Sequence, residues 1–440
     1  MSRRLWSWSI AATGVQLSLT LMTSVILART LGPEGRGVLA AVTIWAPIIA
    51  GIACLSLNDS TLYHLARSQG KEASNRLIGS ALSLQILVGL AAAAILAPIV
   101  PFLMGPDRAP YAGLAVLFTA AFIPMTMIGM HQKAVAQGSF QFSTFNALRL
   151  VLPALYFVIL CGFVLLDRVD WRIVVIVQVA TLGLSLIPAL FMSWPQKPGW
   201  SLPEIRSLVK TGLHFQAANL ILYAAAEADK ILVVSLMGDA DVGLYIGAFA
   251  IASMGVGIVV QTLAVRLMAD VSGAAEDSRP LLARRYTQAA LLLLAVVNLG
   301  LAAVVPFIIP LLLGSAFQPS VLVAEILLLA LFLKGVRSII DQVMRAMHVV
   351  RAGMASEAVA LAVLVCVAPF AVAASGLHGL AWTVVAAQGA ALLCVSVMAA
   401  RRLDVSVLDL WGFSRAGFLD LSETVRKETS RLARMLKSRR

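Results

Sequence analysis

The chain has 440 residues, of which 60% are hydrophobic and 13% are charged, and its formal net charge is +12. A soluble domain carries about 25% charged residues, so this composition excludes an ordinary soluble protein. Because the apolar segments leave no basic soluble domain to hold nucleic acid, the positive charge is better explained by membrane topology and by contact with anionic lipid.

Apolar segments follow one another along the chain up to about residue 402. A membrane-crossing helix needs about 20 mainly apolar residues, whereas the strands of an outer-membrane barrel have about ten residues of alternating polarity. The first segment is long and has no cleavage site of small residues after a short apolar core, so we expect it to be retained. We therefore predict an all-α membrane protein with twelve transmembrane helices, at residues 6–29, 38–62, 77–103, 112–130, 144–166, 172–194, 211–236, 244–267, 286–313, 321–345, 354–375 and 379–400.

Short stretches of the first half recur in the second half. The turn after the first predicted helix, LGPEGRGV at 31–38, matches both glycines of MGDADVGL at 237–244, and the end of the third helix at 101–105 matches 310–314. Gly and Pro favour helix ends, so one match would carry little weight, but two at nearly the same offset indicate a duplication. We expect two pseudo-symmetric six-helix bundles around a central cavity, related by an axis along the membrane normal.

The join between the halves is rich in proline and contains Ser201 and Glu204, a spacing typical of a capping box that predicts a short interfacial helix. Beyond residue 402, apolar residues recur on one helical stripe among many Lys and Arg residues. This pattern predicts a helix that binds anionic lipids on the inner leaflet, with a solvated basic tail as the alternative. The expected domains are an N-terminal lobe at 1–194, a cytoplasmic linker at 195–210, a C-terminal lobe at 211–402 and a basic amphipathic cytoplasmic tail at 403–440.

The distribution of Lys and Arg predicts the orientation of the helices. If the N-terminus is cytoplasmic, most basic residues flank the inner ends of the predicted helices, even when the tail is left out. Cytoplasmic loops carry an excess of Lys and Arg, so we expect both termini on the cytoplasmic side. The exceptions, on the outer flanks, are Arg29, Arg36, Arg108, Arg168 and Arg172.

The seventh predicted helix carries a row of polar and ionisable residues inside an apolar stretch. The row recurs at spacings of three and four, which places its members on one face of a helix. A charge near the bilayer centre costs roughly 2.5–3.5 kcal/mol, so such residues usually face a hydrated interior and mark a transport path. The members are Gln216, Asn219, Tyr223, Glu227 and Lys230, with Asp229 pointing to another side.

The tenth predicted helix carries a second row, Lys334, Arg337 and Asp341, in which Arg337 and Asp341 can pair along the helix. Glu227 and Lys230 can pair in the same way in the seventh helix. For residues near a helix end, the alternative is that a long side chain extends to the lipid headgroups. That alternative applies to Asp59, Arg149, Glu357 and Lys230.

Three motifs carry a resemblance to a known family: LARTLGPEGRG at 27–37, AQGSF at 136–140, and DKIL at 229–232 followed by VGLY at 242–245. They resemble the oligosaccharide flippases of the multidrug, oligosaccharidyl-lipid and polysaccharide exporter superfamily, over roughly residues 5–400. The first predicted helix has no basic residue before Arg29, so the family's best-known bases have no counterpart there. It also has no acidic residue, unlike the drug-antiporter branch.

The resemblance implies a flippase that moves a polyprenyl-diphosphate-linked oligosaccharide across the bacterial cytoplasmic membrane for polysaccharide biosynthesis. A glycan polymerase or export machinery is an expected partner. The diphosphate needs cations, the sugars need hydrogen-bonding groups, and acidic groups would balance the cations or carry coupling protons. The implied residues are Lys230, Lys334, Arg337 and Arg149 for the diphosphate, Gln216, Asn219, Tyr223 and Gln261 for the sugars, and Glu227, Asp229, Asp341 and Asp59 for charge balance or ion coupling.

Two other function classes fit the sequence less well. A cation-coupled exporter of small amphipathic molecules would need acidic residues in both lobes, and Asp59 is the one candidate in the first. A membrane enzyme is disfavoured because the predicted outer loops are short and no nucleophile–base arrangement is visible. The four cysteines lie in apolar segments at spacings that indicate neither disulfides nor a metal site, so we expect no metal and no cofactor.

Overall fold

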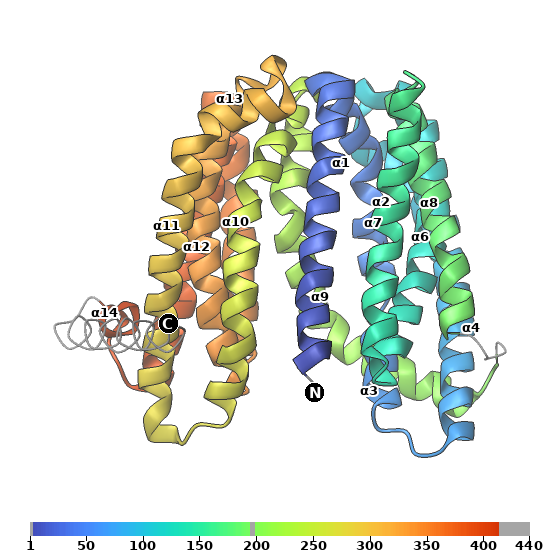
Figure 1. The fold of residues 1–440 in the computed structure, drawn as a ribbon, viewed down its shortest axis with the longest axis vertical. Helices are drawn as coiled ribbons and strands as arrows, with labels where there is room; N and C mark the ends of the chain where they lie inside the picture. The colour runs from blue at the N-terminus through green and yellow to red at the C-terminus, as the bar shows by residue number, and fades with distance from the viewer. Residues whose placement is uncertain (1–2, 194–198, 413–440) are drawn as a thin grey trace, which may run out of the picture. The chain divides into compact units, whose positions relative to one another are not determined.

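A computed structural model describes residues 3–193 and 199–412, and every regular element in these ranges is a helix (Figure 1). The α-helices are α1 (Arg3–Thr43), α2 (Trp45–Ala53), α3 (Leu57–Leu65), α4 (Lys71–Leu96), α5 (Val100–Met104), α6 (Ala109–Gly138), α7 (Phe142–Leu165), α8 (Trp171–Ser193), α9 (Leu202–Leu236), α10 (Asp239–Ser272), α11 (Arg279–Leu313), α12 (Ser320–Ala346), α13 (Arg351–Leu403) and α14 (Val407–Trp411). Short 3-10 turns lie at η1 (Ala97–Ile99), η2 (Pro106–Arg108), η3 (Glu276–Ser278) and η4 (Ser315–Phe317).

Within the described residues, seven helical runs are long and apolar enough to cross a membrane, by length and composition. Large hydrophobic side chains such as Phe102, Leu165 and Phe370 are exposed, as expected where lipid covers the surface. The chain is therefore a multi-pass membrane protein, while the number of twelve crossings stays a prediction. The seven runs are Ala11–Ala53, Lys71–Met104, Pro106–Gly138, Phe142–Leu165, Asp239–Ala264, Glu276–Leu313 and Arg351–Leu403.

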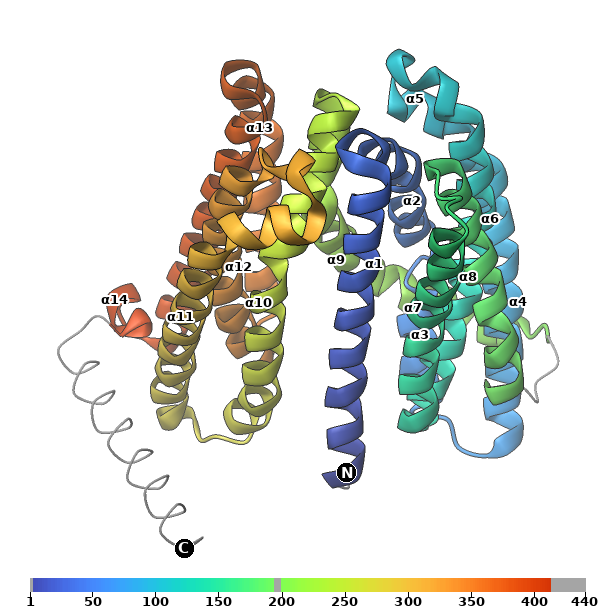
Figure 2. The same cartoon turned by 45° about the horizontal axis from the view of Figure 1, so that its top comes forward.

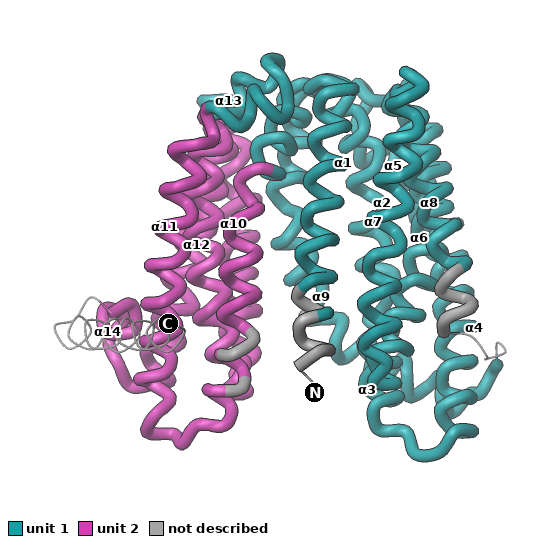
Figure 3. Tube along the Cα trace, viewed as in Figure 1, with its two compact units in different colours: residues 1–250, 307–321, 375–377 teal, residues 251–306, 322–374, 378–440 magenta. Residues whose placement is uncertain are grey.

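The structure divides into two compact units (Figure 3). Unit 1 comprises residues 1–250, 307–321 and 375–377, and unit 2 comprises 251–306, 322–374 and 378–440. In unit 1, α6 packs against α4 and α8, and α7 packs against α8 and α1 (Figure 2). A buried apolar cluster holds the first turns of α9 against α3, α4 and α6; its members include Leu57, Leu65, Leu77, Val135 and Leu208.

Two of the expected turns are kinks inside continuous helices. In α1 the backbone leaves the helical region at Gly32, where φ is 65°, directly before Pro33. A positive φ suits glycine, and Pro33 removes a helical hydrogen bond, so both residues favour the kink. The buried Arg36 guanidinium donates to the carbonyl and hydroxyl of Ser24 across it. In α13 the same kind of break occurs at Gly376, with φ 56°.

The repeated turns of the two halves pack directly against each other inside unit 1. A Cβ atom added to Gly37 would lie 1.6 Å from the Asp239 carbonyl oxygen, and one added to Gly243 would lie 1.8 Å from the Pro33 carbonyl oxygen. Gly37 and Gly243 are the matching glycines of the two turns, and Pro33 and Asp239 also match. The contact is therefore reciprocal, as across a two-fold axis, and only glycine allows so close an approach of the two backbones.

The linker region differs from the expectation in one respect. Residues 202–210 form the first turns of α9 and continue into the predicted seventh helix without a break. The Ser201 side chain makes no capping bond; its backbone amide donates to the Ser80 hydroxyl at 3.1 Å instead. The predicted tail falls mostly at 413–440, outside the described residues, and so does most of the proline-rich part of the linker.

Candidate substrate-translocation site

The polar stripe of α9 begins at a break between α2 and α3. Leu55 and Ser56 both adopt a left-handed conformation, with φ of 48° and 49°. In an unbroken helix these two residues would donate to the carbonyls of Gly51 and Ile52. Gln216 of α9 replaces them: its Nε2 donates to the Gly51 and Ile52 carbonyls at 3.2 and 3.0 Å. Gln216 therefore satisfies helix carbonyls that the break has freed.

The same break is held by further hydrogen bonds to α9. Ser56 Oγ donates to Gln216 Oε1 at 2.7 Å, and Asn219 Nδ2 donates to Ser56 Oγ at 2.9 Å. Asn219 Nδ2 also lies 2.9 Å from Oδ2 of Asp59, which is half-buried. Gln216 and Asn219 were predicted as sugar ligands and Asp59 as an ion-coupling group, and the structure brings the three together.

The upper part of the stripe faces α2 and α10. The half-exposed Tyr223 ring lies over Gly51, where an added Cβ would contact it at 3.6 Å. Lys230 Nζ lies 2.7 Å from Glu227 Oε2 and 5.1 Å from the Phe249 ring centroid. The predicted pairing of Glu227 with Lys230 is thus confirmed.

Asp229 leaves the stripe and contacts α10, the neighbouring helix. Its Oδ2 accepts a hydrogen bond from the fully buried Tyr245 hydroxyl at 2.7 Å. The carboxylate therefore has a fixed partner on a neighbouring helix within unit 1, which is one of the two directions expected for it, the other being the outer interface.

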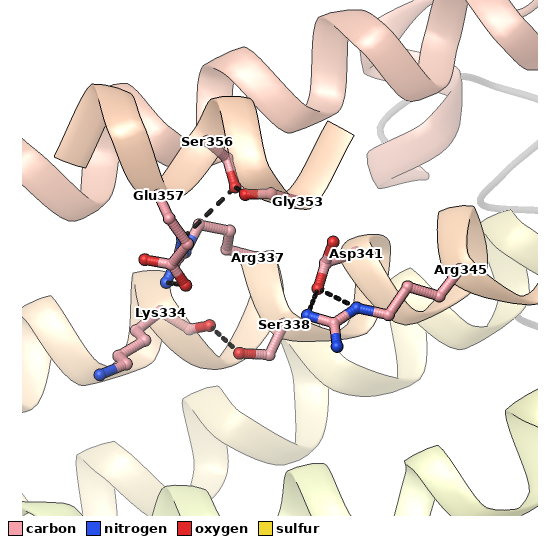
Figure 4. Close-up of polar contacts among 8 residues, drawn as sticks. All are labelled: Lys334, Arg337, Ser338, Asp341, Arg345, Gly353, Ser356 and Glu357. Carbon is pink, nitrogen blue, oxygen red and sulfur yellow. Dashed lines mark hydrogen bonds and ion pairs between the residues drawn. The ribbon is translucent and has the colours of Figure 1, made fainter. Parts of the chain in front are cut away.

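The charged row of α12 lies in unit 2 and contacts α13 (Figure 4). Arg337, with 4% of its side chain exposed, lies 2.8 Å from Glu357 Oε1 and 3.4 Å from Ser356 Oγ. Asp341 pairs with Arg345, one turn further along α12. The expected pairing of Arg337 with Asp341 is therefore wrong: each finds another partner, and one of these lies on a different helix.

Lys334 lies one turn before Arg337 and is half-buried. Its side chain has no hydrogen bond or ion pair with any residue that the structure describes, and Figure 4 draws a contact only at its backbone carbonyl, which accepts from Ser338. No described carboxylate or hydrogen-bond acceptor occupies this ammonium group, so it is available to an anionic ligand.

The remaining two predicted residues lie apart from these rows. Gln261 is exposed on α10 in unit 2. Arg149 lies on α7 in unit 1, where its Nη2 donates to Gln16 Oε1 at 3.0 Å and to Thr13 Oγ1 at 3.5 Å. Arg149 therefore has hydrogen-bond partners on α1.

Sequence reasoning missed three features of the site. The break at Leu55 and Ser56 has no local signal, because neither residue is Gly or Pro. Glu357 was a polar candidate without an assigned partner, and nothing in the sequence indicated that it pairs with the buried arginine of α12. Lys133 was not among the predicted site residues, although it lies within electrostatic range of Arg149. Among the described residues, no group of three or more His, Cys, Asp or Glu side chains is arranged to hold a metal ion.

Two of the arginines predicted on the outer flanks contact helix ends. Arg29 donates to the carbonyls of Leu311 and Leu312 at the end of α11. Arg108 donates to the carbonyls of Val234 and Met237 at the end of α9 and pairs with Asp239 at 2.7 Å. Cations favour helix C-termini, which gives these two outer arginines a structural role.

Comparison with solved structures finds the same fold in transporters. The lipid II flippase MurJ in an inward closed conformation matches with a TM-score of 0.78 and 12% identity, over 93% of this chain and 90% of its own. A multidrug resistance MATE family transporter of the MOP superfamily, inward-facing, matches with a TM-score of 0.74 and 14% identity, over 90% and 98%. A MOP superfamily transporter from Pyrococcus furiosus, described by the reverse polarity of its binding pocket, matches with 0.56 and 15%, over 91% and 95%.

Comparison with curated proteins finds no sequence match. A family model described as polysaccharide biosynthesis protein matches residues 26–322, which is more than half of the chain and includes all three motifs of the sequence resemblance. The chain belongs to this polysaccharide biosynthesis protein family.

Proposed function

We propose that the protein is a flippase that moves a polyprenyl-diphosphate-linked oligosaccharide across the bacterial cytoplasmic membrane by alternating access of two six-helix bundles. Membership of a polysaccharide biosynthesis family and a fold similar to that of MurJ and MATE transporters support this proposal. Both termini lie in the cytoplasm, and the basic tail binds anionic lipid. The proposed activity is transport without a catalytic step.

The observation that carries the proposal is the state of Lys334. Basic residues inside a membrane helix are costly unless they have a counterion or contact water. Lys334 has neither carboxylate nor hydrogen-bond partner among the described residues, whereas Arg337 beside it is neutralised by Glu357. A diphosphate headgroup would provide the counterion that Lys334 lacks.

Transport of the sugar would use the other predicted residues in supporting roles. Tyr223 and Gln261 are the predicted sugar ligands with exposed side chains, while Gln216 and Asn219 hold the α2–α3 break. We propose that the break gives α2 and α3 a joint between the two access states. The acidic residues Glu227 and Asp341 balance the charges of Lys230 and Arg345 when substrate is absent.

Glycan export in a strain that lacks this gene tests the proposal. Lys334→Ala should reduce export about ten-fold or more, since a charge-assisted hydrogen bond contributes about 1.5–3 kcal/mol. Lys334→Arg retains the charge and should export near the wild-type level. Ser338→Ala serves as the matched control, because it removes only a bond to the Lys334 backbone. Full export by Lys334→Ala would contradict the proposed role of this residue.

A cation-coupled exporter of small amphipathic molecules is the second candidate. The MATE fold and the half-buried Asp59 carboxylate beside Asn219 favour it. Sensitivity of the deletion strain to dyes and drugs separates the two functions. Increased sensitivity with normal surface glycan would favour the exporter over the flippase.

A further inference from the structure

Basic side chains in the long helices differ in whether a carboxylate neutralises them. Lys133 of α6 and Arg149 of α7 lie within electrostatic range of each other. Neither forms an ion pair with a carboxylate in the described ranges 3–193 and 199–412. Other cations do: Lys230 pairs with Glu227, Arg337 with Glu357 and Arg345 with Asp341.

The two cations lie at a similar depth on helices that pack together. Lys133 lies five residues before the end of α6, and Arg149 lies seven residues after the start of α7. At 1.5 Å per residue, the two residues lie about 9–12 Å from the turn that joins the helices at residues 139–141. Both side chains are half-buried within unit 1.

The hydrogen-bond partners of Arg149 are neutral. Its Nη2 donates to the side chains of Gln16 and Thr13 on α1, and its Cζ lies 5.6 Å from the Phe145 ring centroid. These hydrogen bonds use one of the three guanidinium nitrogens, so donors remain for a further acceptor. The α1 side chains hold the guanidinium in place without cancelling its charge.

Two cations this close repel each other, and in an apolar bundle the repulsion is only weakly screened. An anion between them would offset the repulsion, give Lys133 an acceptor that no described residue provides, and accept from the remaining donors of Arg149. A phosphate group fits this pair, because a guanidinium binds its oxygens in a bidentate manner and a lysine acts as a point charge.

We propose that Lys133 and Arg149 form a binding site for a phosphate ester. Its ligand in the working protein is the diphosphate of the lipid-linked substrate, held here before translocation, so this inference rests on the proposed function. The phosphate of an anionic phospholipid offers the same chemistry, and the experiment distinguishes the two sources.

The test uses the full-length purified protein in nanodiscs of zwitterionic lipid, with a short prenyl diphosphate and inorganic pyrophosphate as probes. The variant Lys133→Gln/Arg149→Gln should bind both probes about 100-fold more weakly or worse, since two charge-assisted contacts are lost. The control Lys71→Gln/Arg76→Gln removes the same charge from exposed positions on α4 and should keep wild-type affinity. Lys133→Arg should also keep it.

Equal affinity of the double variant and the wild type for both probes would overturn the site. If the double variant does not fold, Lys133→Gln alone, with Lys133→Arg as its rescue, gives the same comparison. Nanodiscs with phosphatidylglycerol identify the source of the phosphate. The site would be assigned to phospholipid if this lipid competes with pyrophosphate only in proteins that retain both cations. In that case the double variant would still bind prenyl diphosphate as the wild type does. Weak probe binding with normal glycan export would refute the substrate assignment and leave the proposed function intact.

Discussion

The stripes of α9 and α12 look alike in sequence, with polar or charged residues at steps of three and four, but their partners differ. On α9, Gln216 and Asn219 make neutral hydrogen bonds that replace missing helix bonds at Leu55 and Ser56. On α12, Arg337 forms a buried ion pair with the next helix, and Lys334 has no partner within the part of the chain that the structure describes. A polar stripe on a helix therefore satisfies backbone carbonyls in one unit and carries charge in the other.

The largest expected effect on stability is at the α12–α13 ion pair. Glu357→Gln should destabilise the protein by about 3–5 kcal/mol, because it leaves the buried Arg337 guanidinium without its counterion. Arg337→Gln/Glu357→Gln should lose less than the sum of the two single variants. Thermal unfolding of the purified variants in detergent measures this coupling. Additive losses would mean that the pair is not the unit of stability on α12.

A smaller effect is expected at the helix break. Gln216→Ala leaves the Ile52 carbonyl without a described side-chain donor and the Gly51 carbonyl with only the weak Cys54 thiol donor, at a cost of about 1–3 kcal/mol. Thermal unfolding measures this loss as well. The control is Gln261→Ala at an exposed position of α10, which should change the free energy of unfolding by no more than about 0.5 kcal/mol. If both glutamine variants behave alike, the α9 stripe does not support the break.

The smallest effect belongs to the Glu227–Lys230 pair. Both side chains are partly exposed and lie three residues apart on one helix, so Glu227→Gln should cost below about 1 kcal/mol. A loss as large as that of Glu357→Gln would remove the contrast between the two stripes.

Much of the helical framework could be predicted, because apolar runs of about 20 residues are strong signals. Pairings along one helix could be predicted only in part. The pairing of Glu227 with Lys230 follows from their spacing and is confirmed. Arg337 instead pairs with Glu357 on the next helix, not with Asp341. Spacing within a helix cannot rank a partner that only tertiary packing brings near.

Breaks in the helices divide in the same way. Gly32 and Pro33 predict a change of chain direction. The sequence suggested a loop there, and the structure has a kink inside α1. The types of Leu55 and Ser56 give no local signal of a helix break. Their left-handed conformation is stabilised by contacts from α9, about 160 residues away in the chain.

Translocation by the purified protein tests the central claim most directly. In proteoliposomes, a fluorescent prenyl-diphosphate-linked sugar added on one side should become accessible to a membrane-impermeant quencher on the other. Wild type and Lys334→Arg should translocate it at similar rates, and Lys334→Ala should be about ten-fold slower or more. Equal rates for Lys334→Ala and wild type, or no translocation by wild type, would contradict the account.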